Sequence, residues 1–187
     1  PTPPATSSAS RSRGSPISLS LARVLALARV SVAAALGRTL TIRRALRAAL
    51  RAGCSFRHLD EALLQLVPFA GFARAINAFI ELRAIHPRAP RGREPGKGRR
   101  KRGEALCRRV YGPVYAKMIA RMGSLHPDLA EWILEDGYGR VLSRPGLSIR
   151  ERELIIVAVL SALKLPLQRE SHIRGALRVG ATRGEVS

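Results

Sequence analysis

A glutamate and a histidine lie in two successive apolar segments near the end of the chain. In "RERELIIVAVLSALKLPLQRESHIRGAL", residues 150–177, Glu153 stands near the start of the first segment and His172 within the second. A partly buried carboxylate beside an imidazole can pass protons near neutral pH, which is the chemistry of a general acid or base. The same two residues can also form a purely structural hydrogen bond in a helical hairpin. Their types alone leave both interpretations open.

The first apolar segment is predicted to be a helix over residues 149–163. Glu153 and Val157 then share one stripe of that helix, so the carboxylate is placed among apolar neighbours. Ser148 and Glu151 form the S-x-x-E capping box that marks a helix start. The capping box assigns Glu151 a structural role and leaves Glu153 as the candidate for chemistry.

The second apolar segment is predicted to be a helix that Pro166 opens and Gly180 closes. Gln168 and His172 lie on one stripe of it, because they are four residues apart. The connection between the two helices is short, so they should be antiparallel neighbours. This arrangement predicts that His172 meets Glu153 across the hairpin.

Composition favours an all-α protein. The chain has 187 residues, enough for one medium domain or two small ones, and 46% of them are hydrophobic. Aromatic residues make up only 4%, and the common residue types are alanine, leucine and arginine, which are strong helix formers. We therefore expect a helical bundle.

The net charge of +20 is unevenly distributed. Residues 1–59 hold ten arginines and no acidic residue, and residues 88–102 hold eight basic residues against Glu94 alone. A basic stretch of this kind can bind nucleic acid. No aromatic residue is interleaved with the charges, however, so a solvated linker is favoured over a nucleic-acid partner.

The cysteines and the hydropathy of the chain indicate in which cellular compartment the protein is expected. Cys54 and Cys107 are far apart and form no CxxC, which argues against a disulfide framework and against a zinc site. The apolar stretch 17–36 is interrupted by Arg23 and Arg29, which argues against a membrane span. We expect a cytoplasmic location. A secretory signal peptide and an organelle transit peptide stay open for the basic N-terminal region.

An internal repeat relates the two halves of the chain. "AALRAGCS" at 48–55 aligns with "GALRVGAT" at 175–182, each with a helix end, a glycine, a small residue and a Ser/Thr cap. After the first copy the sequence continues through two predicted helices. After the second, Thr182 and Glu185 form a capping box just before the sequence stops. This pattern predicts a second unit truncated at its C-terminus.

The motifs in the second half resemble the carboxymuconolactone decarboxylase family, which includes the alkyl hydroperoxidase D-like proteins. The resemblance rests on "YGRVLSRPGLSIRERELIIVAVLSAL", "SHIRGALRVGAT" and, in the first half, "DEALLQLVPFAGFARAINA". It implies an all-α bundle of the alkyl hydroperoxidase D-like type, with two related modules in tandem. The implied division is a disordered arm (1–16), a degenerate first module (17–85), a basic linker (86–103) and a second module (104–187).

The peroxidatic branch of that family uses a Glu, a C-x-x-C and a His. The Glu falls on Glu153 and the His on His172, whereas the two thiol positions fall on Leu165 and Gln168. An alkyl group and an amide cannot replace thiolate nucleophiles. The resemblance therefore predicts no peroxidase or disulfide reductase activity at this site.

The decarboxylase branch works without cysteines and implies a different use of the same positions. His172 would be the acid/base group, Glu153 its partner and Gln168 a polar neighbour, with Arg152 and Arg144 able to hold a substrate carboxylate. No cofactor and no metal are indicated, and the family implies a homo-oligomer. The predicted function is a cysteine-less, decarboxylase-like lyase acting on a small molecule.

A non-catalytic oligomeric scaffold or binding module of the same fold is the alternative. The two differ in what surrounds the Glu–His hairpin. A catalytic hairpin should line a pocket that solvent can reach, whereas a scaffold should bury both residues.

Overall fold

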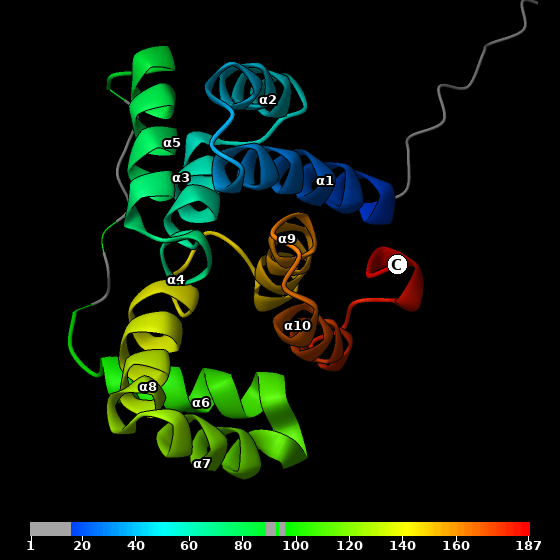
Figure 1. The fold of residues 1–187 in the computed structure, drawn as a ribbon. Helices are drawn as coiled ribbons and strands as arrows, with labels where there is room; N and C mark the ends of the chain where they lie inside the picture. The colour runs from blue at the N-terminus through cyan, green and yellow to red at the C-terminus, as the bar shows by residue number, and fades with distance from the viewer. Residues whose placement is uncertain (1–15, 89–92, 94–95) are drawn as a thin grey trace, which may run out of the picture.

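The all-α prediction is confirmed. The computed structural model describes residues 16–88, 93 and 96–187, and within these ranges the regular structure is helical, without a strand (Figure 1). The predicted arm falls outside the described residues except for Pro16, which opens the first helix. Part of the predicted linker also falls outside them.

The described helices follow one another with short connections. The first half contains α1 (Pro16–Ala35), α2 (Thr39–Arg51), α3 (Phe56–Leu64), α4 (Val67–Ala70) and α5 (Phe72–Ile85). The second half contains α6 (Arg99–Tyr111), η1 (Gly112–Val114), α7 (Tyr115–Leu125), α8 (Pro127–Trp132), η2 (Ile133–Leu142), α9 (Ile149–Ala162), α10 (Pro166–Arg178) and η3 (Arg183–Glu185).

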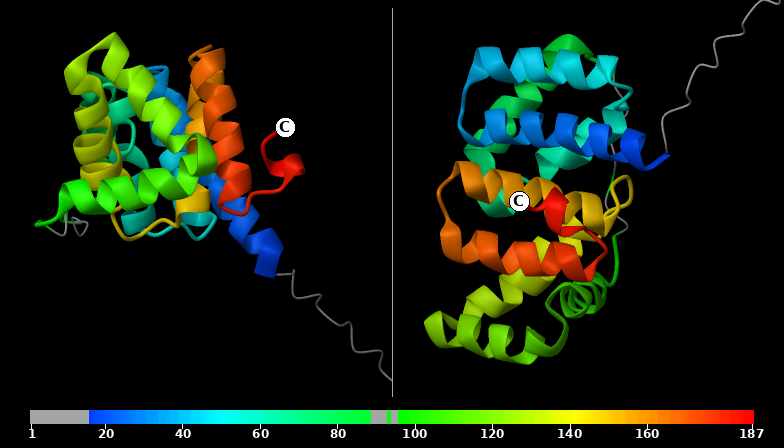
Figure 2. Two further views of the ribbon diagram at one scale, coloured as in Figure 1. Left: turned by 90° about the horizontal axis from the view of Figure 1, so that it is seen from below. Right: turned by 90° about the vertical axis from the view of Figure 1, so that its right-hand side faces the viewer.

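Helix α9 lies at the centre of the molecule. The hairpins α1–α2 and α9–α10 stack with α1 against α9, and α6, α7 and α8 lie on the opposite side of α9–α10 (Figure 2). Ile155 and Val159 of α9 join the apolar core formed by α1–α5, whereas Ile156 and Leu160 join a second core with α6 and η2. A helix buried on almost every side must be apolar nearly all round, as "LIIVAVL" is.

The predicted helix ends are present as local structures. Ser148 and Glu151 form a capping box at the start of α9, and Ser55 forms one with His58 at the start of α3. Glycine follows α2 and α10 with a positive φ, 84° at Gly53 and 99° at Gly180, as a helix C-cap requires. The two copies of the repeat thus end their helices in the same way. Their division into tandem modules stays a prediction.

The predicted linker 86–103 is too long, because α6 already begins at Arg99. Gly103, the last residue of the predicted linker, is buried inside α6. A Cβ at Gly103 would stand 1.8 Å from the backbone oxygen of Leu134, and one at Gly139 would stand 2.3 Å from that of Arg99. Glycine at both positions lets the backbones of α6 and η2 touch, which no side chain would permit.

The segment 127–142 contains two kinds of helix. An α-helix, α8, ends at Trp132 and the chain continues as the π-helix η2 to Leu142. π-helical turns are uncommon and occur often at functional sites. Here the wider turns bring Tyr138 into the second core.

Helix α1 is tied to α9 by charge as well as by apolar contact. Arg23 of α1 forms an ion pair with Glu151 in the capping box of α9. Among the residues that the structure describes, no helix has the length and hydropathy needed to cross a membrane.

Candidate functional site

Glu153 and His172 are in contact across the α9–α10 hairpin. The Oε2 atom of Glu153 lies 2.8 Å from Nδ1 of His172. Glu153 is fully buried and only 7% of His172 is exposed. A carboxylate at Nδ1 favours the tautomer with its proton there, which leaves Nε2 as the basic nitrogen. The predicted meeting of the two residues is therefore present, although the contact alone does not assign catalysis.

A glycine makes room for this contact. Gly175 lies on α10 less than one turn beyond His172, and a Cβ there would stand 2.9 Å from Oε2 of Glu153. The same Cβ would stand 2.7 Å from Cγ1 of Val110 on α6. Because any side chain would collide on both sides, Gly175 allows α6, α9 and α10 to close around the carboxylate.

The imidazole ring is held by a second element. Phe69 of α4 meets the His172 ring edge to face, with the ring centroids 5.2 Å apart. Aromatic pairs favour this T-shaped geometry. The carboxylate and the phenyl ring together restrict the orientation of the imidazole.

Two buried polar atoms near the pair lack a hydrogen-bond partner in the described structure. They are the second carboxylate oxygen of Glu153, Oε1, and the hydroxyl oxygen of Tyr138, whose interaction with the Tyr111 hydroxyl falls outside normal hydrogen-bond geometry. Leaving such an atom unpaired costs about 1–3 kcal/mol, so each one requires an explanation. No sequence motif points to Tyr138. The sequence shows the RPG turn that begins six residues after it, but it does not show the π-helix that turns Tyr138 inward.

Burial keeps the neighbouring acids protonated. It raises the pKa of Tyr138 well above 10, and the Glu153 carboxylate raises it further. Burial also raises the pKa of Tyr111, although a hydrogen bond with Ser171 partly opposes it. The pKa of Cys107 rises to about 12, mainly through burial and secondarily through Glu153. At neutral pH both phenols are therefore hydrogen-bond donors, and the thiol is not a nucleophile.

The two predicted carboxylate-binding arginines lie in an internal ion-pair cluster. Arg144 binds both carboxylate oxygens of Glu61, at 2.9–3.1 Å. Arg152, with no exposed surface, lies 3.0 Å from the same carboxylate and 2.9 Å from the backbone oxygen of Arg144. A substrate carboxylate would have to compete with Glu61 for both arginines. No local motif points to Glu61, because it lies 83 and 91 residues from its two partners in sequence.

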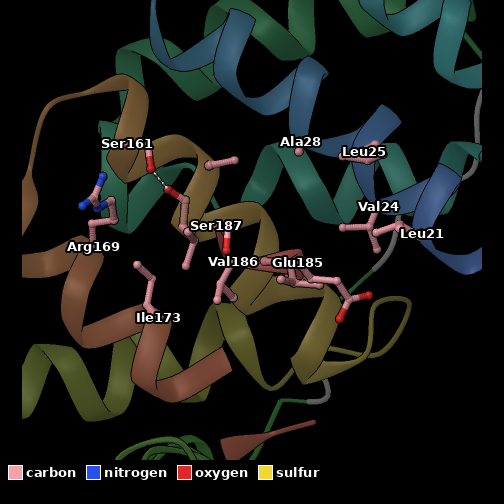
Figure 3. Close-up of a pocket in the computed structure, with 13 residues that line it drawn as sticks. Leu21, Val24, Leu25, Ala28, Ser161, Arg169, Ile173, Glu185, Val186 and Ser187 are labelled. Atoms are coloured by element: carbon pink, nitrogen blue, oxygen red, sulfur yellow. Dashed lines mark hydrogen bonds between the residues drawn. The ribbon is translucent and has the colours of Figure 1, made fainter. Parts of the chain in front are cut away.

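A cavity of about 390 Å³ lies on the α1 side of the hairpin (Figure 3). Val24 and Leu25 of α1, Val157 of α9 and Ile173 of α10 give it largely apolar walls, and Arg169 lies at one side. Neither residue of the Glu–His pair lines it. The structure thus buries the pair and places this cavity elsewhere, which is the arrangement expected of a scaffold.

Both cysteines are buried, in different apolar clusters. Cys54 lies in the core of α1–α5 and Cys107 in the core of α6 and η2. Within the described part of the chain, no group of three or more His, Cys, Asp or Glu side chains is arranged to hold a metal ion.

The sequence of the second half matches a family model. The model of the carboxymuconolactone decarboxylase family aligns with residues 127–187, which include η2, α9 and α10. Over these residues the chain is similar to the carboxymuconolactone decarboxylase family. The matched segment contains both members of the Glu–His pair as well as Tyr138, whereas Glu61 lies outside it.

Two curated proteins are similar to the chain. Peroxisomal protein 2 of Schizosaccharomyces pombe is 35% identical over 134 residues, which cover 68% of this chain and 63% of that protein. The 4-carboxymuconolactone decarboxylase of Acinetobacter baylyi is 29% identical over 89 residues, which cover 47% of this chain and 66% of that enzyme. The chain therefore spans slightly less than two thirds of either relative.

Leu165 and Gln168, which the resemblance aligns with the peroxidatic thiols, lie at the start of α10. Leu165 precedes the helix and is 38% exposed. Gln168 is exposed, one turn before His172. Gln168 can therefore approach a ligand only from the solvent side of α10, and its predicted role as a polar neighbour stays a prediction.

Proposed function

We propose that this chain carries a decarboxylase-like lyase site, at which Glu153 and His172 handle a proton for a small carboxylate-bearing substrate without a cofactor. The observation that carries the proposal is the 2.8 Å contact between a fully buried carboxylate and an imidazole inside the family-matched segment. Such a contact engages Nδ1 of the imidazole in a hydrogen bond and leaves Nε2 available for proton transfer.

The proposed reaction consists of the cleavage of one carbon–carbon bond and the transfer of one proton. Loss of carbon dioxide breaks the carbon–carbon bond to the carboxylate and leaves the electron pair on the substrate carbon. The protonated His172 delivers a proton to that carbon, and Glu153 stabilises the imidazolium form before the transfer. The buried site excludes water, which strengthens the Glu153–His172 attraction.

The first compound to test is 4-carboxymuconolactone, because a relative bears that substrate in its name. Carbon dioxide release should fall about 10²-fold or more in His172→Asn and in Glu153→Gln, the usual contribution of acid–base catalysis. His126→Asn is the matched control, since His126 is exposed at the start of α8. Equal turnover in all three variants would exclude the pair from catalysis.

The scaffold alternative is supported by a specific observation. The pair is buried and neither of its residues lines the 390 Å³ cavity. In a scaffold, His172→Asn lowers the melting temperature, and the wild-type protein turns over neither 4-carboxymuconolactone nor related lactone acids. Turnover by the wild type that His172→Asn abolishes, with a folded variant, excludes the scaffold.

We also propose that the chain forms a homo-oligomer, through the outer face of α5. Phe72, Ile76 and Ile80 repeat every fourth residue there and are 71%, 54% and 59% exposed. The charges beside this stripe are turned away or neutralised: Arg74 extends toward Gly37, Arg83 pairs with Asp60, and Glu81 pairs with Arg43. In a chain of net charge +20, an uncharged apolar face is where two copies can meet without strong repulsion.

The location and the role of the basic linker stay predictions. We expect the cytoplasm, and one relative is named as a peroxisomal protein. Imaging a tagged chain with cytosolic and peroxisomal markers distinguishes the two. For the basic stretch 86–103 we expect no salt-dependent binding of RNA or DNA, and strong binding that is lost when residues 86–98, which precede α6, are deleted would contradict this.

A further inference from the structure

We propose that the cavity between α1, α9 and α10 binds a small amphiphile that has an unbranched apolar tail and one carboxylate. The tail lies between α1 and α9, and the carboxylate meets the guanidinium of Arg169 on α10. A fatty acid of medium chain length has this chemistry. The site is additional to the proposed lyase site, because neither Glu153 nor His172 lines the cavity.

The first support is the shape and composition of the walls. The residues of α9 that line the cavity are Leu154, Val157, Ala158 and Ser161, which share one helix face, and the lining residues of α1 repeat the same spacing. All of them except Ser161 are apolar. Two facing apolar stripes form an elongated slot, and its volume of about 390 Å³ lies within the range of small-molecule sites.

The second support is the difference in polarity between the two ends of the slot (Figure 3). At one end Val24 and Leu154 belong to a small buried apolar cluster, against which Val186 packs. At the other end Ser161 and Arg169 lie together, and both are exposed. A ligand that fills the slot should therefore be apolar along its length and polar at one tip.

The third support is the charge that the cavity offers. Its charged lining residues are Arg169 and Glu185. Glu185 is already engaged, since it forms an ion pair with Arg150 and accepts from the backbone N–H of Thr182 at 2.9 Å.

Arg169, in contrast, forms no ion pair with an acid among the residues that the structure describes, whereas Arg174 on the same helix pairs with Glu170. A guanidinium without a partner can hold a carboxylate through two parallel hydrogen bonds. The cavity therefore presents a positive charge at the polar end of an apolar slot, which is complementary to a carboxylate with an apolar tail.

The inference can be tested separately from the proposed lyase. Leu154 and Ile173 line the cavity, and each follows a member of the Glu–His pair in sequence. A ligand in the cavity would pack against the same two helices without touching the pair. Binding is measured without turnover, and His172→Asn should bind the amphiphile as wild type does. Failure of either proposal leaves the other standing.

The first experiment titrates the whole chain with octanoate, 1-octanol and butanoate, followed by NMR. Octanoate should bind more tightly than octanol, because only octanoate can pair with Arg169. Butanoate should bind far more weakly, since each buried CH₂ that a ligand lacks costs about fourfold in affinity. Octanol that binds as tightly as octanoate, or butanoate that binds as tightly, overturns the proposal.

The second experiment removes the charge. In Arg169→Gln the affinity for octanoate should fall about two- to fivefold, the effect of an exposed ion pair, while the affinity for octanol stays the same. Arg174→Gln is the matched control, because it removes the same charge from α10 at a side chain that already has a carboxylate partner. An octanoate affinity unchanged in Arg169→Gln, or equally lowered in both variants, contradicts the assigned role of Arg169.

The methyl signals of the protein locate the ligand. Octanoate should shift the methyl signals of Val24, Val157 and Ile173, which line the cavity, and leave those of Ile76 and Ile80 on α5 unchanged. Shifts confined to α5 would show that the tail binds another apolar surface. Shifts of the cavity signals that follow protein concentration and not octanoate would show that a second copy of the chain occupies the slot. Either result overturns the proposal.

Discussion

Gly175 of α10 lies directly against the carboxylate of Glu153. A methyl group at Gly175 would approach Oε2 of Glu153 to 2.9 Å and Cγ1 of Val110 to 2.7 Å. The hydrogen bond between Glu153 and His172 therefore depends on a residue that has no side chain.

Gly175→Ala should accordingly displace Glu153 or push α6 away from the hairpin. Overpacking of this kind costs about 1–3 kcal/mol of unfolding free energy. Gly123→Ala in α7 is the control, because its added methyl group meets open space and should stabilise the helix by about 0.5–1 kcal/mol. Denaturant unfolding measures both changes. A Gly175→Ala protein as stable as wild type would show that the three helices are not closed around Glu153.

The buried carboxylate of Glu61 holds two arginines. Glu61→Ala should destabilise the protein by about 3–5 kcal/mol, because it leaves the charges of Arg144 and Arg152 buried without their partner. Denaturant unfolding measures the loss, with Glu104→Ala as control, since Glu104 pairs with Arg108 at the surface and should matter little. Similar effects of the two substitutions would contradict the buried cluster.

Ile76→Asp should prevent self-association through α5. A charge in the centre of the exposed stripe would be desolvated in the interface, so an oligomer should dissociate while the monomer stays folded. Sedimentation velocity measures the mass, and circular dichroism the fold. Leu125→Asp is the control, on an equally exposed leucine at the end of α7. A monomeric wild type, or an oligomer that persists in Ile76→Asp, would show that this face of α5 is not the interface.

Stability should fall at alkaline pH because of Cys107. Burial raises the pKa of this thiol from 9.0 to about 12 in the folded chain. The unfolded chain therefore releases a proton that the folded chain retains, and the stabilisation present below pH 9 is lost as the pH rises toward 12. The stability advantage of wild type over Cys107→Ala should shrink by up to about 1.4 kcal/mol per pH unit in this range. Denaturant unfolding measures the difference in unfolding free energy between wild type and Cys107→Ala. A difference that stays constant from pH 8.5 to 10.5 would contradict the raised pKa of Cys107.

The protein should reduce no organic hydroperoxide through this site. Leu165 and Gln168 occupy the thiol positions, and both cysteines are buried. Turnover with a dithiol reductant should therefore be absent in wild type and in the Cys54→Ser/Cys107→Ser double variant. Activity in wild type that disappears in the double variant would show that a buried thiol becomes accessible.

Local sequence determined the helices and their ends. Capping boxes, glycine caps and apolar periodicity involve residues within one or two turns, so their energies depend little on the rest of the chain. For that reason the start of α9 at Ser148, the turn at Gly180 and the hairpin that joins Glu153 to His172 could be predicted.

Tertiary structure decided which polar groups far apart in the sequence come into contact. Arg144 and Arg152 lie near Glu153 in sequence, but they bind Glu61 because the fold brings α3 beside the turn at Gly146. Tyr138 and Gly103 likewise acquire their roles only where η2 and α6 touch. These contacts depend on how whole helices pack, and no pattern within a single helix encodes its partner.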